Sequence, residues 1–594
     1  MAEYRAPLKD MNFVLQQLVG MDDISTLPGY EEATPDMVSA ILEEAAKLAG
    51  EVLSPLNVIG DQQGVALNEN GDVPTPEGYK EAYQQFVEGG WGSLQFDPDQ
   101  GGQGMPLVLS TPVMEMWQSA NLSWGLCPLL TQGAIEALDA NASAELKNRY
   151  IPKMVSGEWT GSMNLTEPQA GSDLAAIRSR AEPEGDHYRI KGQKIFITWG
   201  EHDMAENIIH LVLARLPDAP PGVRGISLFV VPKYLVNKDG SLAEKNDCGA
   251  VSLEHKMGIH SSPTCVMSFG DQQGAVGYLV GEPHKGLACM FTMMNNARLG
   301  VGLQGVSLSE RAYQLAVDYA RDRVQCPAPG DKEASKIIRH PDVRRMLMTM
   351  RTLTEAGRAL TYSAYGSLDY QHRGTAEQQA YHQARVALLT PIVKGWCTEV
   401  AQEVTSLGVQ VHGGMGFIEE TGAAQYYRDA RILTIYEGTS GIQAQDLVGR
   451  KTLFDQGAAM DCLLNEMLES VEIAQQGSER LKAIAGELLS AIESMGQTQA
   501  FLLKGAKDDI NLAGSLSFNY MMLAGTVCGG WQMLCGASAA ERLLQQSGAD
   551  TDFCDAKLAT AEFYMEQVLP RYLSYAAAAT GGSRSIMAMD ESLF

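Results

Sequence analysis

The chain has 594 residues, 45% of them hydrophobic and 20% charged, which is typical of a globular enzyme with several domains. Its net charge of −27 disfavours binding to nucleic acid or to anionic membrane surfaces, so a polyanionic ligand would need a local cationic site. The ten cysteines are scattered without a C-x-x-C pair, which predicts reduced, mostly buried thiols and a cytoplasmic protein. No metal site is expected.

The first segment, residues 1–156, is predicted to form an N-terminal helical domain. Residues 37–53 carry apolar side chains at three-four spacing, and Thr-Pro-Asp at 34–36 is a helix-start signal. Residues 1–17 are of mixed polarity and lack the charged start and apolar core of a signal peptide.

The second segment, residues 157–282, changes to short β-rich runs separated by turn clusters. This pattern predicts a middle β domain, barrel-like in form, within a mostly α-helical chain. The predicted strands are 187–190, 194–198, 207–216, 225–231 and 264–269.

The helical period then returns. Residues 283–451 are predicted to form a C-terminal helical bundle, and residues 452–594 an additional helical domain. Residues 510–540 contain no charged side chain, but polar residues and glycines interrupt every apolar stretch. This interruption favours a packed helix or a subunit interface and predicts no transmembrane segment.

Gly-Val-Gly-Leu-Gln-Gly at 300–305 fits the G-x-G-x-x-G pattern of dinucleotide-binding proteins. That interpretation requires a preceding strand and a βαβ unit. The preceding residues 287–297 are rich in methionine and fit a helix or loop, and a long amphipathic helix follows to about residue 323. We therefore interpret these glycines as permitting close helix packing.

Two groups of motifs are informative. The first is Leu-Thr-Glu-Pro-Gln-Ala-Gly-Ser-Asp at 165–173 with the strand at 194–198. The second is Gln-Val-His-Gly-Gly-Met-Gly-Phe at 410–417, then Arg-Asp-Ala at 428–430 and Ile-Tyr-Glu-Gly-Thr-Ser at 435–440. Such loops can hold a phosphate or a ring, although each alone also fits a tight turn. Glu437 alone is equally consistent with a solvated carboxylate after a strand-like stretch, Ile432 to Tyr436.

Together, in this order and spacing, the motifs resemble the acyl-CoA dehydrogenase family over roughly residues 39–451. The resemblance implies an FAD enzyme in which Glu437 removes the α-proton of an acyl-CoA while the flavin takes a hydride from the β-carbon. The Glu437 N–H and a ribityl hydroxyl of FAD would stabilise the thioester oxygen. An electron-transferring flavoprotein would be the electron acceptor, and a homodimer or homotetramer the assembly.

The resemblance also assigns the remaining site residues. Ser172, Arg298 and Gly438 would lie near the substrate, and Arg323 would reach the FAD phosphate of a neighbouring subunit. Phe196 stands where many relatives have Trp, and His340-Pro341 stands where His-Gln is frequent, which puts FAD contacts there in doubt. The cofactor-binding residues would be Leu165, Thr166, Ser172, Phe196, Thr198, Arg323, Gln410, His412, Gly413, Gly414 and Thr439.

The acyl group is not fixed by these motifs. The 452–594 extension and the methionines at 290, 293 and 294 favour a medium- to long-chain acyl-CoA in fatty-acid β-oxidation, although core filling explains the methionines equally well. The alternative is the branch acting on 3-methylmercaptopropionyl-CoA. A DNA-associated alkylation-response relative is disfavoured because residues 452–594 hold 18 acidic and 8 basic side chains. A flavin oxidase or monooxygenase is disfavoured because Glu437 is present.

Overall fold

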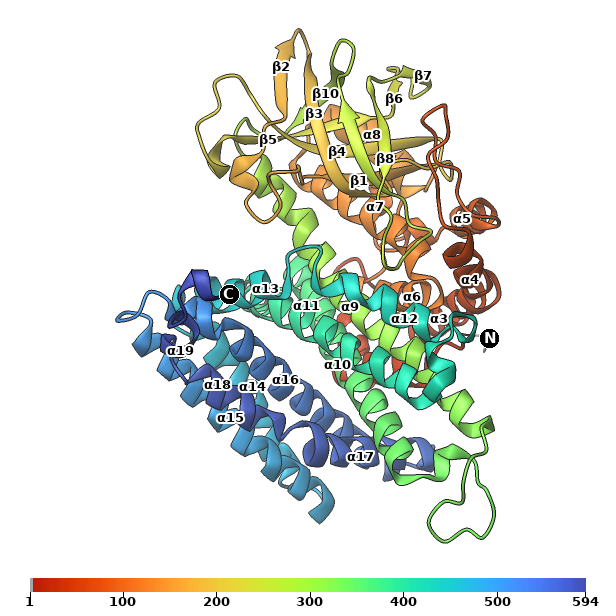
Figure 1. Cartoon of the computed structure of the whole chain (residues 1–594), viewed down its shortest axis with the longest axis vertical. Coiled ribbons are helices and arrows are strands. Elements are labelled where there is room, and N and C mark those ends of the chain that lie inside the picture. Colours follow the sequence, from red (N-terminus) through yellow and green to blue (C-terminus); the bar gives the residue numbers. More distant parts are fainter. Residues whose placement is uncertain (1–3) are drawn as a thin grey trace. The chain divides into compact units, whose positions relative to one another are not determined.

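The structure is a computed structural model that describes residues 4–594 (Figure 1). Its internal contacts divide the chain into two compact units. Unit 1 comprises the residues up to Glu43, Pro106–Glu115 and Arg298–Phe594. Unit 2 comprises Glu44–Met105 and Met116–Ala297. The division into four segments at 156, 282 and 451 stays a prediction.

Unit 2 contains an eight-stranded sheet that closes on itself. Strand β2 pairs with β3 on one side and, at Arg180 and Arg215, with β4 on the other. Because β4, β5, β10 and β3 are also paired in that order, five strands form a ring, as the predicted barrel-like domain requires. The strands are β1 Trp159–Asn164, β2 Arg180–Glu184, β3 His187–Thr198, β4 Asn207–Arg215, β5 Ile226–Pro232, β8 Cys248–Leu253, β9 Thr264–Phe269 and β10 Ala275–Val280, with a separate β6 Tyr234–Val236 and β7 Leu242–Lys245 pair.

Strand β4 is buried along almost its whole length because both of its faces are covered. Ile209, Leu211 and Leu213 pack with helical residues in one core, and Val212 and Ala214 belong to a second core made of strand residues. The two predicted runs 187–190 and 194–198 form the single strand β3. The sequence did not predict strands β1, β2, β6, β7, β8 and β10. The helices in unit 2 are α4 Ser54–Gln63, α5 Tyr79–Glu88, α7 Leu122–Asn141 and α8 Ala144–Val155.

Unit 1 is helical, and its long helices α10, α11, α15 and α16 lie side by side (Figure 1). Three helices, α3 Pro35–Lys47, α6 Leu107–Ala120 and α9 Gly286–Asp322, run across the unit boundaries. The helices within unit 1 are α1 Leu8–Phe13, α2 Met21–Ile24, α10 Pro341–Arg373, α11 Ala376–His412, α12 Ala423–Ala430, α13 Ser440–Val448, α14 Ala458–Ala474, α15 Glu479–Gly505, α16 Leu512–Leu544, α17 Thr551–Phe563, α18 Arg571–Ala579 and α19 Arg584–Met587.

The G-x-G-x-x-G segment lies in the middle of α9 and not at a turn between a strand and a helix. A Cβ atom at Gly302 would lie 2.5 Å from Val393 Cγ1, and one at Gly305 would lie 2.5 Å from the Cys397 carbonyl oxygen. Both neighbours belong to α11. The two glycines therefore permit close approach of α9 and α11, as the sequence predicted.

The C-terminal extension packs on the same helix, α11. A Cβ at Gly525 or Gly529 of α16 would overlap Trp396, and one at Gly395 would overlap Met521. These close approaches confirm that the uncharged stretch is a packed helix. None of the helices among residues 4–594 combines the length and apolar character that a membrane crossing requires. All ten cysteines are free thiols, and seven are buried.

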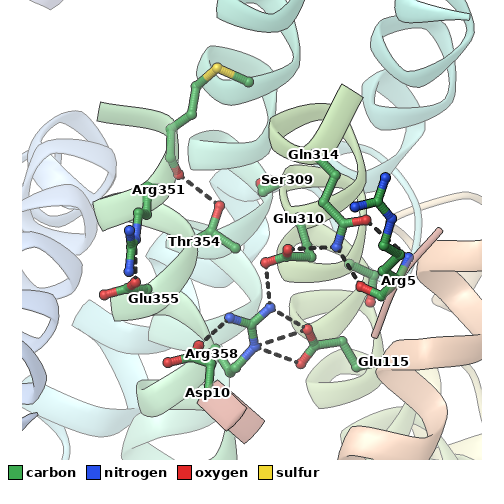
Figure 2. Close-up of polar contacts among 12 residues, drawn as sticks. Arg5, Asp10, Glu115, Ser309, Glu310, Gln314, Arg351, Thr354, Glu355 and Arg358 are labelled. Carbon is green, nitrogen blue, oxygen red and sulfur yellow. Dashed lines mark hydrogen bonds and ion pairs between the residues drawn. The ribbon is translucent and has the colours of Figure 1, made fainter. Parts of the chain in front are cut away.

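A buried charge cluster joins distant parts of unit 1 around Arg358, which is 1% exposed (Figure 2). Its guanidinium donates to Glu115 of α6, Glu310 of α9 and Asp10 of α1. Lys557 of α17 donates to Asp10 as well and lies 3.2 Å from Glu355, which also accepts from Arg351 at 2.8 Å. The N-terminal helix and the C-terminal extension are thus anchored on the same charges.

Candidate active site

Glu437 lies in a short turn of unit 1 between α12 and α13. Its φ is +55° and that of Gly438 is +89°, so two successive residues are left-handed. The strand-like interpretation of residues 432–436 was wrong, because Arg431–Thr434 forms a 3-10 turn that directly continues α12. Gln402 of α11 holds this turn by donating to the Ala430 carbonyl at 2.6 Å.

The environment of Glu437 adjusts its acidity in opposing directions. Burial raises the pKa of the Glu437 carboxyl to about 7, although the positive charges of Arg298 and Lys394 lower it. The side chain as a whole is only partly buried. A carboxyl with these properties is a stronger base than one in water and still ionises near neutral pH.

Two buried side chains that the sequence did not single out hold the turn. Lys394 of α11 donates from Nζ to the Gly438 carbonyl at 2.6 Å. Gln443 of α13 donates from Nε2 to the Glu437 carbonyl at 3.2 Å and to the Gly438 carbonyl at 3.3 Å. One feature of the sequence could have pointed to Lys394: it is the lone lysine in the apolar run Leu-Leu-Thr-Pro-Ile-Val-Lys-Gly-Trp at 388–396.

Arg298 is buried in α9 and close enough to Glu437 for their charges to interact. Its Nη1 lies 4.0 Å from Asp446 Oδ2, and its Nε has no hydrogen-bond partner among residues 4–594. Burial lowers the pKa of its guanidinium. The structure thus places Arg298, Glu437 and Gly438 together.

The end of α11 carries the predicted adenine-side residues. Gln410, Gly413 and Gly414 are exposed, and a Cβ at either glycine would meet no atom within 4 Å. His412 differs, because its side chain is buried, its Nδ1 bonds to the Gly408 carbonyl at 2.7 Å, and its ring lies 4.4 Å from the Tyr319 ring. His412 can therefore contact a ligand mainly through its backbone.

Arg323 is exposed just beyond the end of α9 and donates to Gln325 at 3.1 Å. Thr439 is the N-cap of α13 and its hydroxyl accepts from the Ile442 N–H at 3.2 Å, leaving its own proton available. Pro341 begins α10, where a missing N–H costs nothing, and His340 Nε2 lies 3.0 Å from the Gln325 carbonyl.

Unit 2 holds the predicted flavin loop by a buried ion pair. Lys194 of β3 is fully buried and donates to Glu167 at 2.8 Å and to the Leu165 carbonyl at 3.0 Å. The Ser179 hydroxyl and the Arg178 N–H also donate to Glu167. Burial opposes ionisation of Glu167, but Lys194 and these donors lower its pKa to about 2. The backbone of this loop is therefore fixed.

Next to this pair, β3 is irregular. Its register with β9 shifts between Lys194 and Ile197, and Phe196 takes φ +60° with 59% of its surface exposed. Thr198 is half-buried at the end of the strand, and Ser172 is exposed in the loop. The bulge thus exposes a flat aromatic ring two residues before Thr198, and such a ring can pack against a planar ring system.

Comparisons with known proteins cover nearly the whole chain. Family models match it as acyl-CoA dehydrogenase N-terminal domain (residues 39–158), middle domain (162–272) and C-terminal domain (284–452), and as acetyl-CoA dehydrogenase C-terminal like (463–590). A 3-methylmercaptopropionyl-CoA dehydrogenase of Ruegeria pomeroyi is 50% identical over 95% of this chain and 96% of its own.

A butyryl-CoA dehydrogenase of Syntrophomonas wolfei is 35% identical over 100% of this chain and 99% of its own. The fold resembles that of an acyl-CoA dehydrogenase of Bacillus anthracis solved in complex with FAD. That comparison has a TM-score of 0.74 at 21% identity and covers 98% of this chain and 92% of the other.

Proposed function

The chain belongs to the acyl-CoA dehydrogenase family, whose members are FAD-dependent oxidoreductases, and we propose that it desaturates a short acyl-CoA with Glu437 as the base. The observation that carries this proposal is the Glu437 carboxyl on a left-handed turn, with burial raising its pKa to about 7 and two cations beside it. Such a group is ionised often enough at neutral pH to take a proton from the carbon next to a thioester.

The backbone of the same turn supplies a second function. Among residues 4–594 the Glu437 N–H has no acceptor, whereas the carbonyls of Glu437 and Gly438 are both occupied by donors. A free N–H next to the base can donate to the thioester oxygen as negative charge develops there. The α-proton then moves to the Glu437 carboxylate while that oxygen is held.

The residues present fit FAD. The exposed Phe196 ring and the Thr198 hydroxyl suit the flavin ring, and the loop with Leu165, Thr166 and Ser172 suits the ring edge and the pyrophosphate. When bound, FAD supplies the acceptor for the hydride that leaves the β-carbon. At the end of α11, the open backbone would hold the adenine side, with contacts from Gln410, His412, Gly413 and Gly414. Arg323 of a neighbouring subunit would bind the FAD phosphate, and the Thr439 hydroxyl would contact the cofactor from the loop after the base.

Two observations favour a short substrate. Met290 and Met293, which supported a long flexible pocket, are fully buried in the core with α7 and β4 residues, so core filling explains them. The Ruegeria pomeroyi and Syntrophomonas wolfei relatives are named for 3-methylmercaptopropionyl-CoA and butyryl-CoA. We therefore propose 3-methylmercaptopropionyl-CoA, or a straight-chain thioester of similar length, in preference to the medium- and long-chain substrates of β-oxidation.

We further propose that the enzyme is a cytoplasmic homo-oligomer, a dimer or tetramer, that passes electrons to an electron-transferring flavoprotein. The ten free thiols support the cytoplasm. Exposed apolar side chains next to the adenine-side glycines, with Phe417 at 85% exposure and Met415 and Ile418 at 48% and 44%, support a subunit contact there.

The test compares Glu437→Gln with Glu487→Gln, the same change at an exposed position of α15. Glu437→Gln should retain FAD and CoA binding and lose at least ~10²-fold in kcat, whereas Glu487→Gln should match the wild type. Near-wild-type turnover of yellow Glu437→Gln protein would refute the base assignment.

Dye reduction with a panel of acyl-CoA substrates tests the substrate. Because 3-methylmercaptopropionyl-CoA and pentanoyl-CoA have acyl chains with equal numbers of heavy atoms, kcat/KM should peak at one of them and fall for longer chains. Each buried CH₂ contributes about 0.8 kcal/mol, so a pocket with room to spare would instead show a rise of roughly tenfold for each added pair of carbons. A peak at octanoyl-CoA or beyond would restore the medium- to long-chain interpretation.

A further inference from the structure

The turn that carries Glu437 has an unusual backbone. Glu437 is one of few non-glycine residues with positive φ, and Gly438 after it is also left-handed. A left-handed non-glycine residue costs free energy and persists only where its surroundings hold it. A Cβ at Gly438 would lie 2.7 Å from Gln443 Nε2, so the glycine also permits the close contact of that amide.

Both carbonyls of the turn are held by buried side chains from two helices. Lys394 is 0% exposed, and its Nζ reaches the Gly438 oxygen at 2.6 Å, which is short for a hydrogen bond and typical of a charged donor. Gln443 is also 0% exposed and reaches both oxygens from α13. The turn is therefore fixed from two directions at the residue that bears the carboxyl.

We propose that Lys394 is a positioning residue for the base: it ties down the Gly438 carbonyl, fixes the Glu437 carboxylate and places a positive charge beside it. This inference rests on the proposed role of Glu437. A fully buried cation is expensive, and a neutral donor would satisfy the carbonyl at lower cost. The choice of a lysine therefore indicates that its charge is used at this turn.

The helix around Lys394 leaves it little freedom. Gly305 of α9 allows close approach near Cys397, and Gly525 and Gly529 of α16 allow Trp396 to pack closely. Neighbours on both sides thus limit the position of α11, and the lysine reaches the turn from a fixed backbone. Its side chain has one hydrogen-bond acceptor, the Gly438 oxygen, among residues 4–594.

The charges around Lys394 and Glu437 shift the pKa of Lys394 in opposing directions. Burial lowers the pKa of Lys394 to about 8, with Glu437 and Glu399 raising it and Arg298 lowering it. At neutral pH Lys394 is still mostly cationic and favours the ionised form of Glu437. Tyr436 also interacts with Glu437 and with Asp429, and Arg298 in turn interacts with Asp446 and Arg450.

Lys394→Met in the FAD-loaded enzyme tests the proposal. Methionine has a similar length, and it removes both the donor and the charge. We expect kcat to fall at least ~10-fold with KM nearly unchanged, and the acid limb of kcat/KM to move up by about 1 pH unit, the scale for loss of one nearby opposite charge. Amide hydrogen exchange in residues 435–440 should become faster, because the turn loses its shortest hydrogen bond from a side chain, the one from Lys394.

Two further variants separate the parts of the proposal. Gln443→Met loosens the turn without removing charge, so exchange should rise while the acid limb stays in place. Lys557→Met removes another buried lysine of unit 1 from two carboxylates far along the chain from Glu437, so it should lower stability and leave the acid limb unchanged. This opposite pattern controls for general loss of a buried cation. Lys394→Gln, which keeps an amide donor and removes only the charge, keeps the test decisive if Lys394→Met does not fold.

The outcomes also distinguish this proposal from the assignment of the base. An unchanged acid limb and unchanged exchange in Lys394→Met, or an unchanged acid limb in Lys394→Gln, would overturn the positioning role even if Glu437→Gln is inactive. Full turnover in Glu437→Gln would instead remove the premise on which the role rests.

Discussion

Replacing Arg358 by methionine removes the cation at the centre of the buried charge cluster of unit 1. The guanidinium donates to Glu115 from both Nε and Nη2, to Glu310 at 2.7 Å, and to Asp10. Methionine offers no donor, so three buried carboxyls lose a partner.

The magnitude follows from which carboxyls keep a partner. Asp10 keeps Lys557, and Glu115 keeps the Tyr362 hydroxyl at 2.7 Å, but neither Glu115 nor Glu310 retains an ion pair within the cluster. Removing one partner of a buried ion pair costs about 3–5 kcal/mol, and we expect a loss of that size in the free energy of unfolding.

The loss should also depend on pH. Burial opposes ionisation of Asp10, but Lys557 and Arg358 lower its pKa to about 2, below its unfolded value near 4. A lowered folded pKa contributes stability that is complete above the unfolded pKa and is lost as pH falls toward 2. The difference between wild type and Arg358→Met should therefore be largest above about pH 4 and shrink below it.

Urea unfolding followed by helical circular dichroism measures this loss, and the transition that reports unit 1 is the one to compare. Arg345→Met is the matched control, because Arg345 lies on the same helix, is half-exposed and pairs with the exposed Asp342. Its replacement should leave the midpoint nearly unchanged. Equal midpoints for Arg358→Met and Arg345→Met would refute the reasoning.

Two further predictions concern function. Because Glu437 acts as a carboxylate and burial raises its pKa to about 7, kcat/KM should be level above about pH 8 and fall about tenfold per pH unit well below 7; a flat profile from pH 5.5 to 8 would contradict this. Arg323→Ala should raise the Kd for FAD ~10-fold or more, while Arg321→Ala, two residues earlier and also exposed, should not. A native enzyme that is monomeric by light scattering and fully loaded with FAD would exclude the shared site.

Much of the architecture could be predicted because it rests on local patterns. The return of three-four spacing after residue 283 predicted the bundle, and the helix- or loop-like residues 287–297 directly before Gly300 argued against a dinucleotide site. The missed strands lacked such a signal. Strand β2, for example, is five residues long with a proline, and it owes its place to pairing with β3 and β4.

The site was less predictable, because its supports come from distant positions. Glu437, Arg298 and Gly438 were found through their motifs, and the structure brings them together in unit 1. Lys394 and Gln443 were missed because their function depends on contacts with the turn at Gly438, which lies 44 residues from Lys394 and 5 residues from Gln443 in the sequence. His412 lies within a motif, yet only the structure shows that its imidazole faces the helix backbone and not the surface.

The hydrogen bond between Lys557 and Asp10 spans 547 residues and has a consequence for synthesis. All of unit 2 has been translated once Ala297 is added, whereas unit 1 needs the final helices. At roughly 5–20 residues per second, the ribosome needs about 13–52 s more to add Lys557. During that interval Asp10 has no Lys557 to pair with, so helix α1 lacks one of its buried charge partners until α17 has been made.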